Sequence, residues 1–313
     1  MCRALESSIV SATATIDIPA IETSSTEPLR LVCSEVWGGN RPIHRAVELP
    51  GVRGTLFSQP CEGGRGGDVH YMSVCGSGIL SRMCLADVVG HGEAVAAISD
   101  QMHAHMRRSM NTPDQRRVLG DLNTQLEQLG FKAMTTAAAL TYYTPPRNLA
   151  VSYAGHPPGW LYDKAQRRWT RLELDPLPET AHALTNGPLA IEPKVPFTRK
   201  SIKMQIGDRI VLVTDGVLEA PDVSGDLFGD DRMQKVLDDN RGGDCAMIGE
   251  AILAALTEHR GGPQLDHDDV TFLVAEIVPG PGGPAFWNAV KCHITRPRGN
   301  SAEIDLPSPA SHR

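Results

Sequence analysis

The sequence lacks the features of several protein classes. It has no CxxC pair, and its seven cysteines are odd in number and scattered along 313 residues. This usage indicates reduced thiols in a cytoplasm rather than a disulfide framework. No apolar run approaches the roughly 18 residues that cross a bilayer, and the first twenty residues lack the charged start and long apolar core of a signal peptide. We therefore expect a cytoplasmic protein without a membrane segment.

A surplus of positive charge is also missing. Lys and Arg number 30 against 37 Asp and Glu, which gives a formal net charge of −7. A general nucleic-acid binder needs the opposite balance, because it must neutralise phosphates. With 41% hydrophobic and 21% charged residues, the composition is that of an ordinary globular protein. The length allows one large domain or two small ones, and no internal repeat is visible.

The two ends of the chain differ from its middle. Residues 1–45 are rich in Ser, Thr and Pro and show no sustained periodicity, which predicts a flexible leader. A Pro/Gly cluster after Val278 marks a domain edge. We expect the tail that follows, residues 279–313, to be largely disordered. A single folded domain is therefore placed at residues 46–278.

The pattern between these ends mixes helices with strands. Apolar residues at three- and four-residue steps predict helices over residues 93–110, 112–129 and 244–259, with Thr112 as the N-cap of the second. Strands are predicted at residues 68–74, 79–88, 135–143, 149–153, 209–214 and 270–277. Hairpins outnumber strand–helix–strand alternations, which favours an α+β fold of antiparallel sheets with helices packed outside.

Two aspartates stand near the ends of the stretch GDVHYMSVCGSGILSRMCLADVVGHG, residues 67–92. If this stretch is a hairpin whose turn is centred between Ser77 and Gly78, Asp68 faces Asp87 across the ladder. Their Cβ atoms would then lie about 4.5–5.5 Å apart. Carboxylates so placed repel each other and lose hydration. Either one of them is neutralised or a cation lies between them.

Further carboxylates are expected at the same place. Asp215 follows an apolar run in VLVTDGVLEA, and Asp268 and Asp269 precede one in LDHDDVTFLVAEI. If these strands are antiparallel neighbours, the end of one and the start of the other share a sheet edge. Such an all-oxygen set prefers Mg²⁺ or Mn²⁺ over zinc.

Each of these motifs also has a simpler interpretation. TDG can be a turn, DD a helix cap or an exposed loop, and GHG a turn with unusual backbone angles. Their conjunction with the matching hairpin register is what favours a metal site.

The same segments, in this order, resemble a known family. They are GGDVHYM (66–72), ADVVGHGEAVA (86–96), YAGHPPGWLY (153–162), GDRIVLVTDGVLEA (207–220), LFGDDRM (227–233) and DDVTFLV (268–274). The series is similar to the metal-dependent PPM class of serine/threonine phosphatases (protein phosphatase type 2C), and most of all to its bacterial SpoIIE and RsbU-like branch. The resemblance spans about residues 49–278 and implies a four-layer αββα sandwich, two antiparallel sheets flanked by helices.

The resemblance also implies a ligand set for two Mn²⁺ or Mg²⁺ ions. Asp68 would bind one ion, and Asp87 would bridge both. The backbone carbonyl of Val88 would add a further ligand. Asp215 and Asp268 would hold the second ion, whereas Asp269 would support the site without binding metal.

The implied reaction is hydrolysis of a phosphoserine or phosphothreonine ester by a hydroxide that two metal ions share. The absence of a GxSxG motif, or of a Cys-x5-Arg loop near the strands, agrees with a reaction that needs no phospho-enzyme. Relatives of this branch act in signal transduction on a phosphorylated anti-sigma-factor antagonist. Fewer than about fifty residues precede the region of resemblance, too few for a sensor domain, so we expect control by a separate regulatory protein.

Other roles stay open at this point. His91 is the candidate catalytic residue, as proton donor to the leaving alkoxide, although its place in the GHG turn gives it a simpler structural role. Tyr71 stands where many relatives carry an acidic residue, and His156 is expected to be structural. The alternatives to a protein phosphatase are a non-catalytic metal-binding or partner-docking module of the same fold, and a hydrolase of small phosphate esters.

Overall fold

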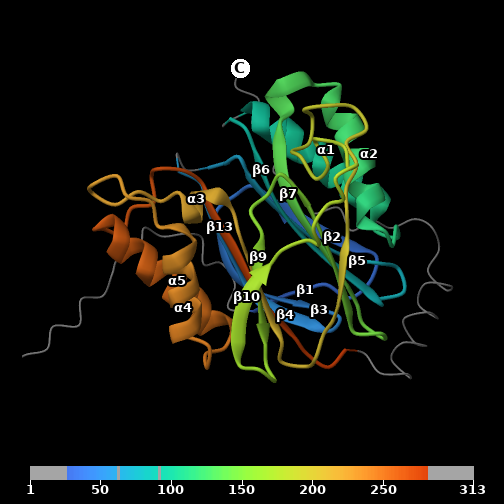
Figure 1. The fold of residues 1–313 in the computed structure, drawn as a ribbon. Helices are drawn as coiled ribbons and strands as arrows, with labels where there is room; N and C mark the ends of the chain where they lie inside the picture. The colour runs from blue at the N-terminus through green and yellow to red at the C-terminus, as the bar shows by residue number, and fades with distance from the viewer. Residues whose placement is uncertain (1–26, 62–63, 91–92, 281–313) are drawn as a thin grey trace, which may run out of the picture.

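The computed structural model describes residues 27–61, 64–90 and 93–280 of the chain (Figure 1). The strands of this part form two sheets, one of seven strands and one of six. In spatial order the seven-stranded sheet contains β1 (Leu29–Arg30), β3 (Ile43–Leu49), β4 (Val52–Gln59), β13 (Val270–Ile277), β12 (Arg209–Val213), β9 (Gly159–Asp163) and β10 (Arg168–Leu172). The six-stranded sheet contains β11 (Lys200–Lys203), β8 (Asn148–Ala154), β7 (Thr135–Tyr143), β6 (Leu80–Val88), β5 (Asp68–Val74) and β2 (Glu35–Gly39).

Helices cover the outer faces of both sheets, and Figure 1 shows the two groups on opposite sides of the molecule. The helices are α1 (Glu93–Ser109), α2 (Gln115–Glu127), α3 (Asp215–Leu218), α4 (Gly229–Asp239) and α5 (Cys245–Arg260), with a short 3₁₀ helix, η1 (Gly130–Ala133), before β7. Helices α1 and α2 pack on the six-stranded sheet, and α3, α4 and α5 pack on the seven-stranded sheet.

Three apolar layers hold this arrangement together. The central layer lies between the sheets and includes Leu56, Leu140 and Leu273, each at most 2% exposed. A second layer joins the seven-stranded sheet to α4 and α5, and a third joins the six-stranded sheet to α1 and α2. Strands that bury both faces carry almost no charged residues, as β7 and β13 show. The predicted αββα sandwich is confirmed.

The details of the sheets correct the sequence analysis in two respects. Strand β1 pairs with β3 in parallel, so the seven-stranded sheet is not wholly antiparallel. Strands β1 and β2 and the start of β3 also fall within residues 1–45, which the sequence analysis assigned to a flexible leader. Their apolar side chains contribute to the central layer, Leu29 and Trp37 among them. Residues 1–26 and most of the predicted tail, 281–313, lie outside the described residues.

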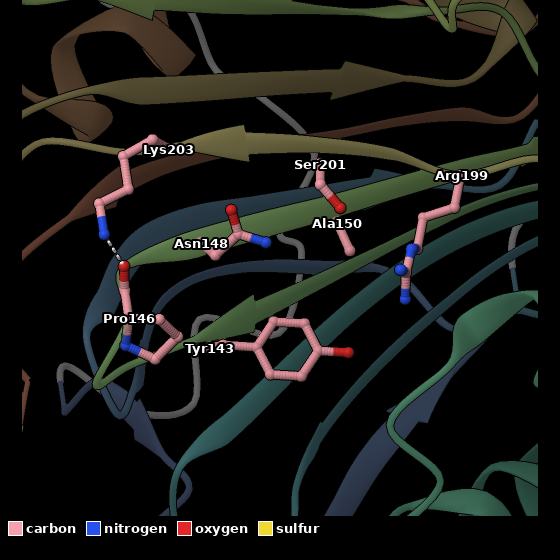
Figure 2. A pocket seen from close by; sticks show the side chains of 7 residues that line it. All are labelled: Tyr143, Pro146, Asn148, Ala150, Arg199, Ser201 and Lys203. Carbon is pink, nitrogen blue, oxygen red and sulfur yellow. Dashed lines mark hydrogen bonds between the residues drawn. The ribbon is translucent and has the colours of Figure 1, made fainter.

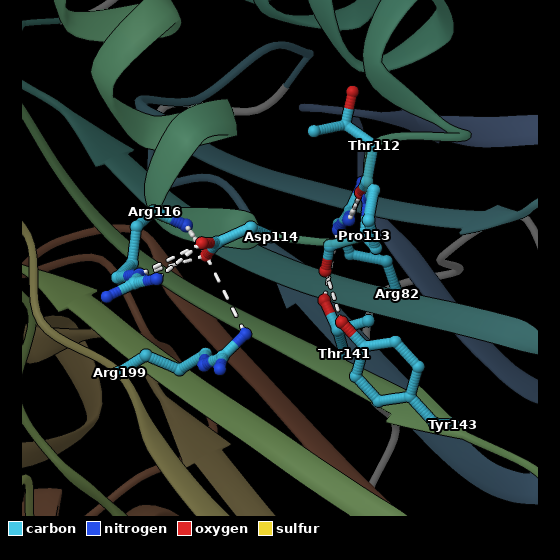
Figure 3. Close-up of polar contacts among 8 residues, drawn as sticks. All are labelled: Arg82, Thr112, Pro113, Asp114, Arg116, Thr141, Tyr143 and Arg199. Atoms are coloured by element: carbon cyan, nitrogen blue, oxygen red, sulfur yellow. Dashed lines mark hydrogen bonds and ion pairs between the residues drawn. The ribbon is translucent and has the colours of Figure 1, made fainter.

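The start of helix α2 also differs from the prediction. Asp114 rather than Thr112 is the N-cap, because its carboxylate accepts the Arg116 N–H at 3.1 Å. Thr112 instead offers its carbonyl to the buried guanidinium of Arg82 at 2.6 Å, as Figure 3 shows. Arg82 lies in β6 and also donates to the Ser109 carbonyl at the end of α1. This one side chain therefore fixes the connection between α1 and α2 to the sheet beneath it.

No helix within residues 27–61, 64–90 and 93–280 combines the length and the apolarity that a bilayer-crossing segment requires.

Candidate metal centre

The β5–β6 hairpin places two acidic side chains directly opposite each other. Asp68 opens β5 and pairs with Asp87 near the end of β6, which confirms the register predicted from the turn. Asp68 is 3% exposed, and Asp87 is half-buried. Facing positions of an antiparallel pair project to the same side, so the two carboxylates share one small region.

The other two predicted ligands come from the neighbouring sheet. Strands β12 and β13 are antiparallel, and the Thr214 N–H donates to the Thr271 carbonyl at 2.9 Å. Asp215 therefore follows β12 at the edge where Asp268 precedes β13. A Cβ atom at Gly216 would lie 1.9 Å from the Asp269 carbonyl oxygen, so the Asp-Gly turn rests directly on the start of β13 and only glycine fits there.

Two polar side chains bind the ends of the two sheets to each other. The Thr214 hydroxyl, after β12, donates to the Asp68 carboxylate at 2.7 Å. The Asp269 carboxylate accepts backbone N–H groups of Cys61 at 2.8 Å, of Asp68 at 3.2 Å and, through a short contact, of Gly67. Asp269 is thus occupied by the loop that leads into β5. This agrees with a supporting role and leaves Asp268 as the exposed member of the pair.

Backbone oxygens complete this end of the sandwich. A Cβ atom at Gly67 would lie 2.6 Å from the Val88 carbonyl oxygen, 3.0 Å from that of Gly90 and 3.3 Å from Asp87 Oδ1. These three oxygens therefore surround one spot beside the hairpin, and a larger residue than glycine would fill it. The predicted Val88 ligand belongs to this group.

The electrostatics of the cluster favour a bound cation. Burial, followed by the charge of Asp87, raises the pKa of Asp68 well above its ordinary value, and the Thr214 hydrogen bond offsets part of this rise. Burial and the charges of Asp215 and Asp268 raise the pKa of Asp87 to about 7. The pKa of Asp215 is raised by burial and by Asp268. Because these shifts disfavour the ionised forms, a divalent ion that compensates the negative charge would bind with a large electrostatic gain.

The cluster is not a closed cage. Among the described residues, no three His, Cys, Asp or Glu side chains are already grouped at coordinating distance. Asp215 is half-buried and Asp268 is exposed, so both side chains have room to turn toward an ion, whereas Asp68 is fixed by Thr214. The donor set is oxygen alone, which suits Mg²⁺ or Mn²⁺. The donor types therefore fit such ions, provided that Asp215 and Asp268 turn toward them.

Several residues that contribute to the carboxylate cluster were not predicted from the sequence. Thr214 immediately precedes Asp215 in the TDG motif, and this position is the one feature of the sequence that could have indicated its role. Glu219 lies close enough for its charge to raise the pKa of Asp87 and of Asp215. His267 donates from Nε2 to the Gly216 carbonyl at 2.7 Å, which ties the loop before β13 to helix α3. His91 lies outside the described residues, so its role stays a prediction.

Tyr71 and His156, the other two residues discussed from the sequence, make contacts that stabilise the fold. The Tyr71 hydroxyl donates to the Ser99 carbonyl through a short contact, which fastens β5 to helix α1. His156 is buried, stacks on Tyr153 and lies with Nδ1 2.9 Å from the Pro157 carbonyl oxygen. Burial lowers the pKa of His156 to about 4, so its ring stays neutral at physiological pH.

Replacing Asp269 with alanine should destabilise the metal-free protein by about 3–5 kcal/mol, because three backbone N–H donors lose their acceptor. Asp268→Ala is the matched control and should change stability little, since Asp268 is exposed. Urea unfolding in excess EDTA measures both. Equal losses for the two variants would contradict the supporting role of Asp269.

The charge of Asp87 should make the metal-free protein less stable as pH rises. The folded-state pKa is about 7, above the ordinary value near 4, so the unfolded chain releases this proton first. Between pH 4 and 7 the Asp87 carboxyl should lower stability by roughly 2–4 kcal/mol, and Asp87→Asn should remove this part of the fall. The part that Asp68 and Asp215 contribute should remain. Urea unfolding in EDTA across this range tests the prediction. Mn²⁺ at pH 8 should restore stability to the wild type and not to Asp87→Asn; an identical pH dependence of both proteins would refute the assignment.

Comparison with known families agrees with this geometry. Residues 81–278 match the Stage II sporulation protein E (SpoIIE) family. The matched region runs from β6 to the end of β13, so it contains Asp87, Val88, Asp215 and Asp268, and Asp68 precedes it. No curated protein matches the chain.

Solved structures show the same fold. The RsbU and RsbW domains of a Mycobacterium tuberculosis protein are 21% identical, with a TM-score of 0.62 over 77% of this chain and 64% of that chain. The PP2C phosphatase domain of SpoIIE from Bacillus subtilis, solved with a fragment of its regulatory domain, is 15% identical, with a TM-score of 0.56 over 78% of this chain and 63% of that chain. RsbX in complex with magnesium is 16% identical, with a TM-score of 0.54 over 75% of this chain and 100% of that chain.

The match spans less than two thirds of the length of the first two structures, and at these identities the likeness shows the fold alone. That fold is the one of PP2C phosphatase domains. Together with the match over residues 81–278, it identifies the chain as a member of the Stage II sporulation protein E family.

Proposed function

We propose that the chain is a metal-dependent protein serine/threonine phosphatase. The observation that carries the proposal is the convergence of Asp68, Asp87, Asp215 and Asp268 on one end of the sandwich, from four segments of two sheets. A fold alone does not need four mutually repelling carboxylates in one place. The raised pKa values of three of them indicate that the cluster is arranged for a cation rather than for stability.

The ligand roles follow from the placement of each group. Asp68 and the Val88 carbonyl would hold one ion, and Asp215 and Asp268 the other. Asp87 would contact both, because it faces Asp68 across the hairpin and its pKa responds to the charges of Asp215 and Asp268. RsbX, which has a similar fold, was solved in complex with magnesium. When bound, a pair of divalent ions lowers the pKa of water and offsets the charge that develops on the phosphoryl oxygens.

The protein's own groups position this chemistry. Thr214 holds the Asp68 carboxylate from the second sheet, and Asp269 fixes the loop that carries Asp68 through three backbone N–H groups. Two buried cysteines are unsuited to act as a thiol nucleophile. Burial raises the pKa values of Cys84 and Cys245 to about 12, so both thiols stay protonated.

We further propose that the substrate is a phosphorylated anti-sigma-factor antagonist and that a separate regulatory protein controls the reaction in the cytoplasm. The names of the similar structures, RsbU, RsbX and SpoIIE, support this substrate class. The net charge of −7 argues against nucleic acid as a partner.

The test compares phosphatase activity on a phosphoserine protein with Mn²⁺ and with EDTA. Asp215→Asn should lower the Mn²⁺-dependent rate by at least about 100-fold, because one ion loses a ligand and several kcal/mol of transition-state stabilisation. Asp239→Asn, an exposed carboxylate on α4, is the matched control and should retain full activity. Equal rates for Asp215→Asn and wild type, or no effect of EDTA, would contradict the proposal.

Two additional arms separate the alternatives. Cys292 and Arg298 have the Cys-x5-Arg spacing of thiol phosphatases in the sequence, so Cys292→Ser should leave the rate unchanged. A rate on the phosphoprotein that far exceeds the rate on p-nitrophenyl phosphate supports a protein phosphatase over a hydrolase of small esters. Metal binding without turnover of either substrate would indicate a non-catalytic module.

A further inference from the structure

A cavity of about 400 Å³ opens at the opposite end of the six-stranded sheet from the carboxylates (Figure 2). Its lining comes from the ends of β7, β8 and β11 and consists of Tyr143, Pro146, Asn148, Ala150, Arg199, Ser201 and Lys203. Along β7, the residue facing Asp87 is Thr136, whereas Tyr143 faces Leu80 at the far end of β6. Seven residues of strand separate them, roughly 23 Å. The cavity is therefore a separate site from the metal centre.

Strand β11 and the residue before it present three alternate residues to the cavity. Ser201 pairs with Ala150 and Lys203 with Asn148, so these four side chains share one face of the sheet. Arg199 precedes Ser201 by two positions and lines the same space. Because β11 is the edge strand of its sheet, this face is open on one side.

The chemistry of the lining is complementary to an anion. It contains a guanidinium, an ammonium, the Ser201 hydroxyl and one amide, and no carboxylate is among the seven lining residues. The Tyr143 hydroxyl already donates to the Pro113 carbonyl. Lys203 donates to the Pro146 carbonyl (Figure 2), and an ammonium group keeps two further donors. The rings of Tyr143 and Pro146 and the methyl group of Ala150 form an apolar wall beside these donors.

The Arg199 guanidinium has N–H donors that are free to bind a ligand within the described part of the chain. Among the residues that the structure describes, the carboxylate that pairs with it is that of Asp114, at 3.9 Å, as Figure 3 shows. Asp114 is already satisfied by the Arg116 side chain at 2.6 Å and by the Arg116 N–H. No hydrogen bond from the Arg199 guanidinium is formed within the described part of the chain. A planar group with five N–H donors binds phosphate or carboxylate through two parallel hydrogen bonds.

We propose that this cavity binds a small organic anion through a phosphate or carboxylate group, with Arg199 and Lys203 as its cationic contacts. The volume lies within the range of small-molecule sites, and the apolar wall favours a ligand with a flat apolar body over a bare inorganic ion. The ligand competes with Asp114 for Arg199. The site is independent of metal and of phosphatase activity.

The experiment is an NMR titration of the isotope-labelled full chain in excess EDTA, which removes metal-dependent phosphate binding. Phenylphosphonate, whose P–C bond resists hydrolysis, is one probe, and phthalate, a flat dicarboxylate, is the other. At least one probe should shift the backbone amide signals of residues 199–203 and of Asn148. The probe that binds more tightly identifies phosphate or carboxylate as the preferred group.

Three variants make the result specific. Arg199→Ala removes the main contact, and Ser201→Glu keeps Arg199 and adds a negative charge to the cavity; each should weaken binding at least about tenfold. Arg168→Ala removes an exposed arginine from the edge strand β10 of the other sheet and should bind as the wild type does. The proposal is overturned if neither probe shifts the signals of β11, if shifts are confined to Asp68 and Asp87, or if Arg199→Ala and Ser201→Glu both bind with wild-type affinity.

Discussion

Repulsion between carboxylates at one end of the β-sandwich is the constraint on which the rest of this structure depends. Asp68 faces Asp87 within one sheet, and Asp215 and Asp268 reach the same region from the other. Burial raises the pKa of Asp68 and brings that of Asp87 to about 7. A protein keeps such a cluster at a cost in stability. The cost is explained if the cluster's purpose is to bind divalent cations.

The surrounding fold holds these groups in place from several directions. Thr214 joins Asp68 to the second sheet, and Asp269 binds the loop before β5 through backbone N–H groups. The site depends on both side chains, although neither of them needs to contact a cation. At the end of the six-stranded sheet that lies far from the carboxylates, Arg82 fastens the connection between α1 and α2 to strand β6. The helices that follow the β5–β6 hairpin are thereby anchored at a point distant from the carboxylates.

Much of this could be predicted from the sequence, because the decisive signals are local. The turn at Ser77 and Gly78 fixes the register of the hairpin, and strands β7 and β13 have the bounds that their apolar runs predict. Long-range contacts could not be predicted. The parallel pairing of β1 with β3 depends on tertiary packing, and Thr112 loses its expected capping role because Asp114 caps α2 while Arg82 takes the Thr112 carbonyl. The Thr214–Asp68 bond joins residues 146 positions apart, for which no sequence pattern exists.

The most direct test of the account is anomalous diffraction at the manganese absorption edge, from crystals of the protein grown with Mn²⁺. Two peaks should lie at coordinating distance from the carboxylates of Asp68, Asp87, Asp215 and Asp268 and the carbonyl of Val88, with Asp87 contacting both. Asp269 should remain bound to the backbone and contact neither ion. Ordered manganese found elsewhere, or its absence from this end of the sandwich at saturating Mn²⁺, would contradict the account.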